Sequence, residues 1–176
     1  GRSGGSWSLL TSATPDADNA APASLGAINN LRINEWMATS DGQDWLELFN
    51  ADPLPVNLAG TYVTDDPSIS GQTNTLVAPL SFIAGAGWVK FAADGDLSKG
   101  RDHLRFSLDA LGETVRVYSP TLSLIDSVHI RVQQVGVAQG RWPDGTATFV
   151  SFPATPTPGE PNYLPHPAIV INEVLT

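Results

Sequence analysis

The chain has 176 residues, no cysteine and a formal net charge of −9, with 18 acidic side chains against nine basic ones. The lack of cysteine excludes disulfides, thiolate metal sites and cysteine nucleophiles. The basic residues are scattered, which argues against nucleic acid or anionic lipid as a partner, and no apolar run reaches the roughly 18 residues of a membrane-inserted helix.

Two segments of the chain occur twice at nearly the same spacing. TPDADN at 14–19 returns as TPGEPN at 157–162, and LRINEWMAT from Leu31 returns as IVINEVLT near the end of the chain. Two independent matches at nearly one period predict a slice of a repetitive protein. Repetition is more typical of spacing, adhesive or binding proteins than of enzymes, because an active site is usually needed once.

The repeats predict the domain boundaries. GRSGGS is small and polar, and we interpret it as an expression scar or linker. The predicted divisions are 1–6 for that scar, 7–30 for the tail of a preceding repeat or a linker, 31–164 for one whole unit, and 165–176 for a linker and the first strand of a following unit.

Within 31–164 the chain carries many short β signals and no helical periodicity. Apolar residues alternate in these segments, and β-branched or aromatic types are common: DWLELFN, TYVTD, NTLVAPL, GWVKFAAD, HLRFSL, ETVRVYS, LSLIDSVHI and ATFVSF. Turn formers such as Ala59-Gly60 and Asp66-Pro67 separate them. The pattern predicts a β-sandwich or barrel.

Alternate positions of these strands supply the predicted core. Its expected members are Trp45, Leu48, Val63, Trp88, Val89, Phe91, Leu104, Phe106, Val115, Val117, Leu124, Ile125, Val128 and Phe149. In DWLELFN the alternation places Trp45, Glu47 and Phe49 on the face opposite Leu46 and Leu48. Glu47 must therefore be paired, or lie at a sheet edge.

Seven ordered motifs resemble the bacterial lamin-tail domain. They are INEWMATSDGQDWLELFN, VNLAGTYVTDD, IAGAGWVKFAADG, LRFSLDALGETVRVYSP, LIDSV, GRWPDG and TPGEPN. The resemblance covers about 31–162 and implies an immunoglobulin-like β-sandwich that serves in adhesion or anchoring on large exported bacterial proteins. The coiled-coil rod and chromatin contacts of nuclear lamins are not carried over, because this chain is acidic and has no heptads.

The motif residues have structural explanations. In GRWPDG, Pro143 and Gly145 suit a tight turn, Arg141 can bond carbonyls or a carboxylate, and Trp142 can cover the end of the core. TPGEPN is expected to be a proline-stiffened exit from the last strand. The repeated Asn34-Glu35 is expected to anchor the first strand.

Catalytic readings have little support in the sequence. Glu35, Asp44 and Glu47 lie close enough in sequence to suggest a carboxylate pair for glycoside hydrolysis, but such a pair needs an open cleft. His103, His129 and His166 lack metal-ligand spacing. No GxSxG nucleophile elbow occurs.

Calcium is the one metal that the sequence suggests. Asp94, Asp96, Ser98 and Asp102 provide oxygen donors at the first, third, fifth and ninth places of a calcium-type loop. The glycine falls one place late, and Arg105 stands where the closing glutamate belongs. A solvated acidic hairpin loop is the expected alternative, so no cofactor is predicted apart from this calcium candidate.

We therefore expect a non-catalytic structural or interaction module of a repetitive exported bacterial protein, located outside the cell or in the cell envelope. Its expected partner is a protein or a cell surface. The alternative is a carbohydrate-binding module attached to a secreted hydrolase, which the five tryptophans suggest. The terminal IVINEVLT, 169–176, is expected to be an extended tail or a strand that pairs with a sheet edge, including that of a second molecule.

Overall fold

The structure is a computed structural model, and it describes residues 1–3, 6–39 and 44–165. Over these residues the fold is all-β, as predicted, with antiparallel strand pairs and two short 3-10 helices, η1 (Ile28–Asn30) and η2 (Ser70–Thr73). No helix in this part of the chain is long and apolar enough to cross a membrane. The predicted terminal strand at 169–176 lies outside the described residues.

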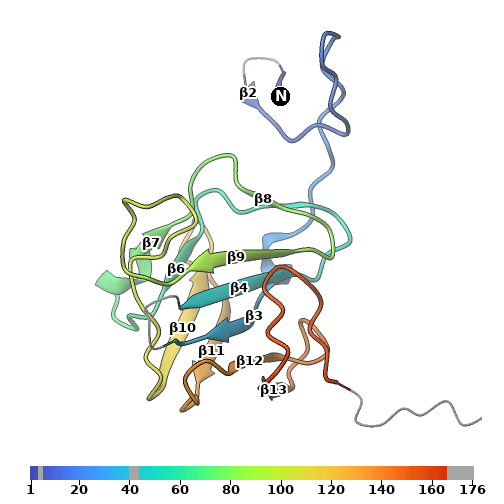
Figure 1. The fold of residues 1–176 in the computed structure, drawn as a ribbon. Helices are drawn as coiled ribbons and strands as arrows, with labels where there is room; N and C mark the ends of the chain where they lie inside the picture. Colours follow the sequence, from blue (N-terminus) through green and yellow to red (C-terminus); the bar gives the residue numbers. More distant parts are fainter. Residues whose placement is uncertain (4–5, 40–43, 166–176) are drawn as a thin grey trace, which may run out of the picture.

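Two main sheets make up the fold (Figure 1). The five-stranded sheet has the order β13-β12-β3-β4-β9, with β3 (Leu31–Met37), β4 (Trp45–Asn50), β9 (Trp88–Ala92), β12 (Ala138–Arg141) and β13 (Phe149–Phe152). The four-stranded sheet has the order β11-β10-β6-β7, with β6 (Tyr62–Thr64), β7 (Thr75–Leu76), β10 (Glu113–Tyr118) and β11 (Leu124–Ile130). Two small two-stranded sheets pair β1 (Arg2–Ser3) with β2 (Ser6–Trp7), and β5 (Val56–Asn57) with β8 (Phe82–Ile83).

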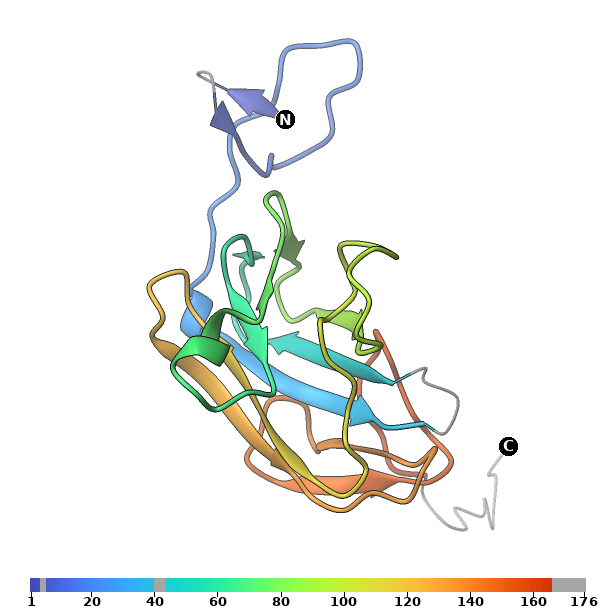
Figure 2. The same ribbon diagram turned by 90° about the vertical axis from the view of Figure 1, so that its left-hand side faces the viewer.

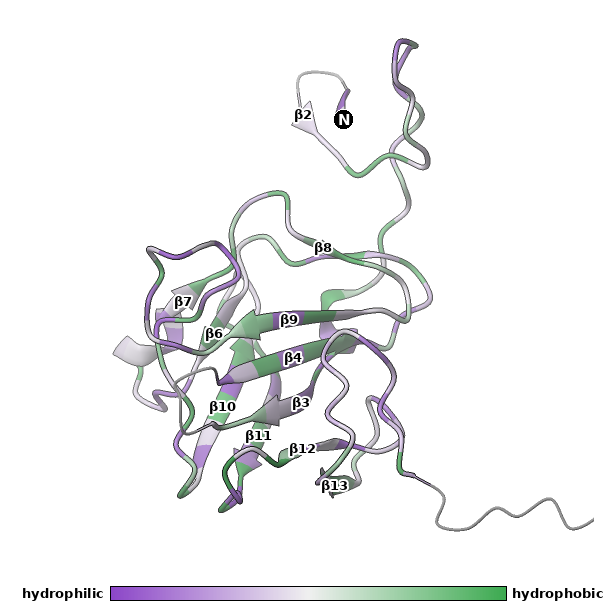
Figure 3. Cartoon of the chain, viewed as in Figure 1, coloured by the Kyte–Doolittle hydropathy of each residue, from purple (hydrophilic) through white to green (hydrophobic). Residues whose placement is uncertain are grey.

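The two main sheets pack over one apolar core in a sandwich-like arrangement (Figure 2). Hydrophobic residues gather along the strands, while the connecting loops are mostly hydrophilic (Figure 3). Burial confirms nine of the predicted core residues: Trp45, Leu48, Val63, Phe91, Leu104, Phe106, Val115, Val117 and Val128. Trp88, Val89 and Ile125 are half-buried.

Two core predictions are wrong, both at sheet edges. Leu124 is 55% exposed and Phe149 is 48% exposed. Leu124 opens β11 and Phe149 opens β13, and each of these strands ends its sheet, so neither side chain is covered on both sides. The prediction also missed deeply buried members of the core, among them Leu31, Ile33, Trp36, Leu46, Leu58, Ile83 and Ile130.

Both faces of β4 are covered, as its mixed alternation indicated. Leu46 and Leu48 enter the core between the sheets. On the opposite face, Trp45 packs with Ala138 and Phe152 in a second, smaller apolar cluster. The chain after β13 runs back over this outer face, and Leu164 packs against the cluster.

A β-bulge in β3 places two consecutive polar residues on the outer face. Ile33 pairs with Leu48 and Glu35 pairs with Glu47, which leaves Asn34 as the extra residue. An extra residue bends the strand and turns its side chain out of the normal alternation. Asn34 and Glu35 therefore lie on the same side of the sheet as Glu47.

The two sheets are also joined by a buried ion pair. Asp126 of β11 accepts a hydrogen bond from the Ile33 amide, 2.8 Å, and forms an ion pair with the Arg141 guanidinium, 3.0 Å. Arg141 also donates to the carbonyls of Ile33 and Thr146. The expectation that Arg141 binds carbonyls or a carboxylate is confirmed on both counts.

Candidate functional site

The outer face of the five-stranded sheet carries a buried cluster of carboxyl groups. Asn34 and Glu35 come from β3, Glu47 from β4, and Asp144 from the turn between β12 and β13. Both glutamates have no exposed surface. Residues 155–162, called the strap below, lie over them. We call the four residues Asn34, Glu35, Glu47 and Asp144 the carboxylate cluster.

Glu47 is held by neutral donors. Its Oε1 accepts from the Asn34 side-chain amide, 3.1 Å, and its Oε2 accepts from the backbone N–H of Gly159. Lys90 lies opposite Glu47 in the strand register, but its ammonium group lies over the Trp45 ring, 5.9 Å from the ring centre. The sequence-based expectation that Glu47 must be paired is therefore met by hydrogen bonds.

Glu35 is held by the strap. The Thr157 backbone N–H donates to both carboxyl oxygens at 3.2 and 3.1 Å. The Thr157 hydroxyl lies 3.1 Å from Glu35 Oε2 and 2.7 Å from Asn162 Oδ1. The Asn162 amide nitrogen donates to the Arg141 carbonyl, which fixes the side chain with its oxygen toward Thr157.

The single proton of the Thr157 hydroxyl faces two acceptors. If Glu35 is protonated, its carboxyl O–H donates to the Thr157 hydroxyl oxygen, and the Thr157 hydroxyl donates to Asn162 Oδ1. Each of the three side chains then has a matched hydrogen-bond partner. The geometry therefore favours the neutral acid at Glu35.

Burial raises the pKa values of both glutamates, since an apolar environment disfavours the charged form. The pKa of Glu35 rises to about 7 and that of Glu47 to about 8. Hydrogen bonds from Thr157 and from Gly159 and Asn34 partly oppose these rises, whereas the charge of Asp144 adds to both.

Asp144 connects the turn to the strap. Its Oδ1 accepts from the Asn34 side chain, 2.8 Å, and from the Asn162 backbone N–H, 3.2 Å. Asn34 Oδ1 in turn accepts from the Gly145 N–H, 3.0 Å. The predicted turn is present, with a hydrogen bond from the Thr146 N–H to the Pro143 carbonyl and a positive φ of 70° at Gly145.

Among the three carboxylates singled out from the sequence, the structure brings two together. Glu35 and Glu47 pair directly across β3 and β4. Asp44 lies elsewhere, where its carboxylate accepts from the Thr39 and Leu108 backbone N–H groups. General acid–base hydrolysis requires carboxyl groups that reach substrate, and a fully buried pair bonded to its own chain does not.

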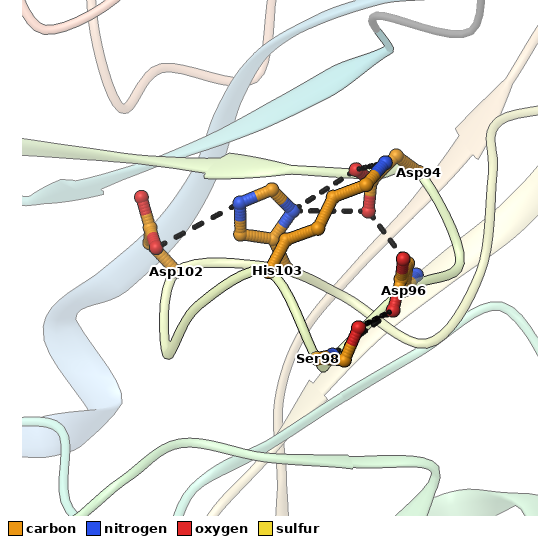
Figure 4. Close-up of polar contacts among 6 residues, drawn as sticks. Asp94, Asp96, Ser98, Asp102 and His103 are labelled. Carbon is orange, nitrogen blue, oxygen red and sulfur yellow. Dashed lines mark hydrogen bonds and ion pairs between the residues drawn. The ribbon is translucent and has the colours of Figure 1, made fainter.

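The acidic loop is held together by its own cations and hydroxyl groups (Figure 4). Asp94 accepts from the Lys99 ammonium, 2.8 Å, and lies 3.0 Å from His103 Nδ1. Asp96 accepts from the Ser98 hydroxyl and N–H. Asp102 lies on the far side of the imidazole, 4.0 Å from Nε2.

The hydrogen bonds to Lys99 and His103 hold the pKa of Asp94 well below its usual range. In the described ranges, no group of three or more His, Cys, Asp or Glu side chains is placed to hold a metal ion. The calcium hypothesis for Asp94, Asp96, Ser98 and Asp102 remains a prediction for solution measurement.

His129 lies on β11, apart from this loop. His129 Nδ1 lies 3.1 Å from the Thr114 hydroxyl on the neighbouring strand. His166 lies outside the described residues.

A groove opens between the free edges of the two sheets. Its volume is about 480 Å³. Its lining includes Trp36, His129, Arg131, Gln139, Phe149 and Ser151. Trp36 and Phe149 contact each other with ring centres 5.8 Å apart, and the buried Trp36 indole N–H has no hydrogen-bond partner among the described residues. This groove therefore offers both aromatic and polar groups to a ligand.

A search against protein-family models finds no match, and a search of curated proteins finds no significantly similar sequence.

Sequence reasoning missed the association of three motifs. Asn34-Glu35, Asp144-Gly145 and Thr157–Asn162 were each expected to act as a local strand anchor, turn or exit, yet they share one hydrogen-bond network. The repeats were the available signal, because Asn-Glu and TP…N are the residues that return along the chain. No such repetition marked Asp126.

Proposed function

We propose that this chain is a non-catalytic structural and interaction module of the lamin-tail type, with an immunoglobulin-like β-sandwich fold. It serves as one bead of a repetitive exported bacterial protein, outside the cell or in the cell envelope, in spacing, adhesion or partner docking. One observation carries the proposal. The carboxylates best suited to acid–base chemistry, Glu35 and Glu47, have no exposed surface and are used to hold the chain's own strap.

The resemblance to the lamin-tail family is supported by where its motifs lie. INEW, GRWPDG and TPGEPN are far apart in sequence, and their Asn34, Asp144 and Asn162 are bonded in one network. Antiparallel sheets of five and four strands over one core are in keeping with an immunoglobulin-like fold. Fold likeness does not itself assign a function, so the closed cluster is the stronger support.

Turnover assays test the proposal. The chain and its Glu47→Gln variant are incubated with model glycosides, esters and peptides, and their melting temperatures are measured in parallel. We expect no turnover above buffer from either protein, while the melting temperature responds to the substitution. Turnover by the unaltered chain that Glu47→Gln abolishes at an unchanged melting temperature would overturn the proposal.

The groove favours the alternative of a carbohydrate-binding module. Sugars bind to aromatic faces that have polar groups beside them, and Phe149 is 48% exposed next to Gln139 and Arg131. A polysaccharide pull-down with Phe149→Ala tests this function, and Tyr163→Ala serves as the control because Tyr163 is 54% exposed and does not line the groove. Retention that only Phe149→Ala abolishes would establish sugar binding, and no retention of the unaltered chain would remove it.

A further inference from the structure

The two TP…N segments adopt the same turn. In the strap, the Glu160 N–H donates to the Thr157 carbonyl at 3.0 Å, and in the N-terminal segment the Ala17 N–H donates to the Thr14 carbonyl at 3.4 Å. The third residue has a positive φ in each turn, 88° at Gly159 and 58° at Asp16. A non-glycine residue rarely adopts this conformation. The repeat found in the sequence is therefore also a repeat of structure.

The correspondence extends to the contacts of the final asparagine. Asn162 donates from its side-chain amide to the carbonyl of Arg141, 2.7 Å, and Asn19 donates in the same way to the carbonyl of Arg2, 2.6 Å. Each arginine lies in the first strand of a hairpin and directly follows a glycine in sequence. The hairpin is β12–β13 for Arg141 and β1–β2 for Arg2. We call Arg2 with 14–19 the N-terminal copy. Residues interpreted above as an expression scar thus take part in it.

The two copies differ in what lies beneath them. The strap covers the carboxylate cluster and donates to it through the backbone N–H groups of Thr157, Gly159 and Asn162. The N-terminal copy stands away from the sandwich (Figures 1 and 2), with most of residues 14–19 exposed. The described part of the chain therefore holds two such turns and one carboxylate cluster.

The N-terminal copy has the groups that the cluster binds. The strap uses three backbone N–H groups and the side chains of Thr157 and Asn162, and the N-terminal copy offers the same groups at 14, 16 and 19. The third position differs, with Asp16 in place of Gly159. A Cβ built at Gly159 meets no atom within 4 Å, so a side chain has room there.

We propose that the carboxylate cluster is a recognition site for the T-P-x-x-x-N turn, and that the N-terminal copy of a second molecule of this chain is its second ligand, exchanging with the strap. This deepens the proposed interaction function by naming a partner for it. The strap has the advantage of being tethered to the same chain, which raises its effective concentration at the site. Asp16 and Asp18 bring two further negative charges close to three carboxyl groups, so exchange is favoured as the pH falls.

Peptide binding to a strap-weakened chain tests the proposal. Asn162→Ala removes the side chain that links the strap to Arg141 and Thr157. Labelled peptides of equal length, 11–22 and 154–165, are titrated into this variant and into the unaltered chain. We expect both peptides to bind the variant, and 154–165 to bind it at least about ten-fold more tightly than it binds the unaltered chain, the factor that corresponds to roughly one hydrogen bond. A Thr14→Ala/Asn19→Ala version of peptide 11–22 should not bind.

Each outcome has a defined meaning. If Asn162→Ala keeps the circular dichroism spectrum of the unaltered chain and binds neither peptide, the recognition site is overturned. Binding of 154–165 without 11–22 overturns the role of the N-terminal copy. If the variant does not fold, amide hydrogen exchange of the unaltered chain decides. Excess peptide 154–165 should then speed exchange at Gly159, and an unchanged rate overturns the site. None of these outcomes affects the turnover assays.

Discussion

Glu35 and Glu47 hold protons more tightly in the folded chain than in the unfolded chain. Their pKa values, about 7 and about 8, lie above the ordinary value of 4.5. Between pH 4.5 and about 8 the folded state binds more protons than the unfolded state. The free energy of unfolding is therefore highest at mildly acidic pH and falls as the pH rises toward and through about 7 to 8. Glu113, whose pKa burial also raises to about 7, adds to the same trend.

Glutamine substitutions should reduce this pH dependence. Glu47→Gln and Glu35→Gln each remove one proton-binding group, so the loss of melting temperature between pH 5 and pH 8.5 should shrink in both variants. It should not vanish, because Glu113 remains. Glu160→Gln, at an exposed position of the strap, serves as the control. A slope as steep in both buried variants as in the unaltered chain would contradict the assigned pKa values.

Arg141 is another residue whose replacement should strongly lower the stability of the fold. Arg141→Met leaves Asp126 buried without its cation and leaves the Ile33 carbonyl without its donor. Loss of one partner of a buried ion pair typically costs about 3–5 kcal/mol. Urea unfolding should show a loss of this size, whereas Arg131→Met, at an exposed cation, should lie within about 0.5 kcal/mol of the unaltered chain. Equal losses of stability in the Arg141→Met and Arg131→Met variants would show that the ion pair contributes no more than an exposed cation does.

At the scale of elements, the contact between β12 and β3 depends on a glycine, Gly140, because it has no side chain at the point where the strands meet. A Cβ on Gly140 would lie 2.4 Å from the Asn34 carbonyl oxygen and 3.0 Å from the Glu35 Cα. Both of these are backbone atoms, so the strands would have to separate. Gly140 therefore permits the close approach of the two strands at the bulge.

Gly140→Ala should consequently destabilise the fold by about 1–3 kcal/mol, the usual cost of overpacking. Thermal unfolding measures the loss, and Gln139→Ala on the same strand provides the comparison. The substitution should also increase amide exchange at Thr157, because shifting β3 displaces Glu35. A Gly140→Ala chain as stable as the Gln139→Ala chain would contradict the packing of β12 on β3.

The acidic loop offers a test at the same scale. The Lys99 ammonium and the His103 ring nitrogen already contact the Asp94 carboxylate, so we expect identical melting temperatures with EDTA and with millimolar calcium. A higher midpoint with calcium would establish the metal site. Lys99→Met removes the ammonium group from Asp94 and leaves the His103 contact in place, so it should strengthen any calcium effect.

Most of the predicted strands are present because alternation is a local property, but the prediction for HLRFSL is wrong, since that segment makes only isolated bridges at His103 and Ser107. DWLELFN and ETVRVYS both became strands, and the alternation of Glu47 against Leu48 was correct. Whether a strand lies at the edge or in the centre of its sheet is not a local property of its sequence. Leu124 and Phe149 have the same pattern as buried residues, and only the order of strands in the sheets leaves them exposed.

The carboxylate cluster could not be predicted from local sequence patterns, for a related physical reason. Its members come from positions as far apart as Asn34 and Asp144, and the bulge in β3 decides which face of the sheet carries Asn34 and Glu35. TPGEPN was read as a stiff exit, whereas its N–H groups turn back onto Glu35 and Glu47. Only the repetition of these residues marked them as related.

At the scale of the whole molecule, the N-terminal segment is held mostly by itself. In the described ranges, hydrogen bonds such as those from the Ala23 N–H to the Leu9 carbonyl and from the Thr11 N–H to the Ala21 carbonyl join partners within residues 1–23. Contacts to the sandwich begin at Gly26, whose N–H donates to the Pro55 carbonyl. The sandwich therefore does not draw its stability from the residues before Gly26.

Deletion of residues 1–23 should leave the melting temperature within about a degree or two, as expected when fewer than 0.5 kcal/mol are lost. Calorimetry measures this change. Deletion of 155–165 is the comparison, and it should lower the midpoint strongly because Glu35 and Glu47 lose their donors. A large loss from the N-terminal deletion would reveal contacts between the two parts.

The bond between Glu35 and Thr157 has a mechanical consequence. β3 is the first strand of the sandwich, and the strap lies close to the end of the described residues. A pull on both ends of the domain therefore enters through Leu31 and leaves through the strap, and the two are tied directly to each other at Glu35. Tension along the chain would load this small group of bonds together with the first pairs of β3 with β4, so the carboxylate cluster contributes to the force at which the domain begins to open.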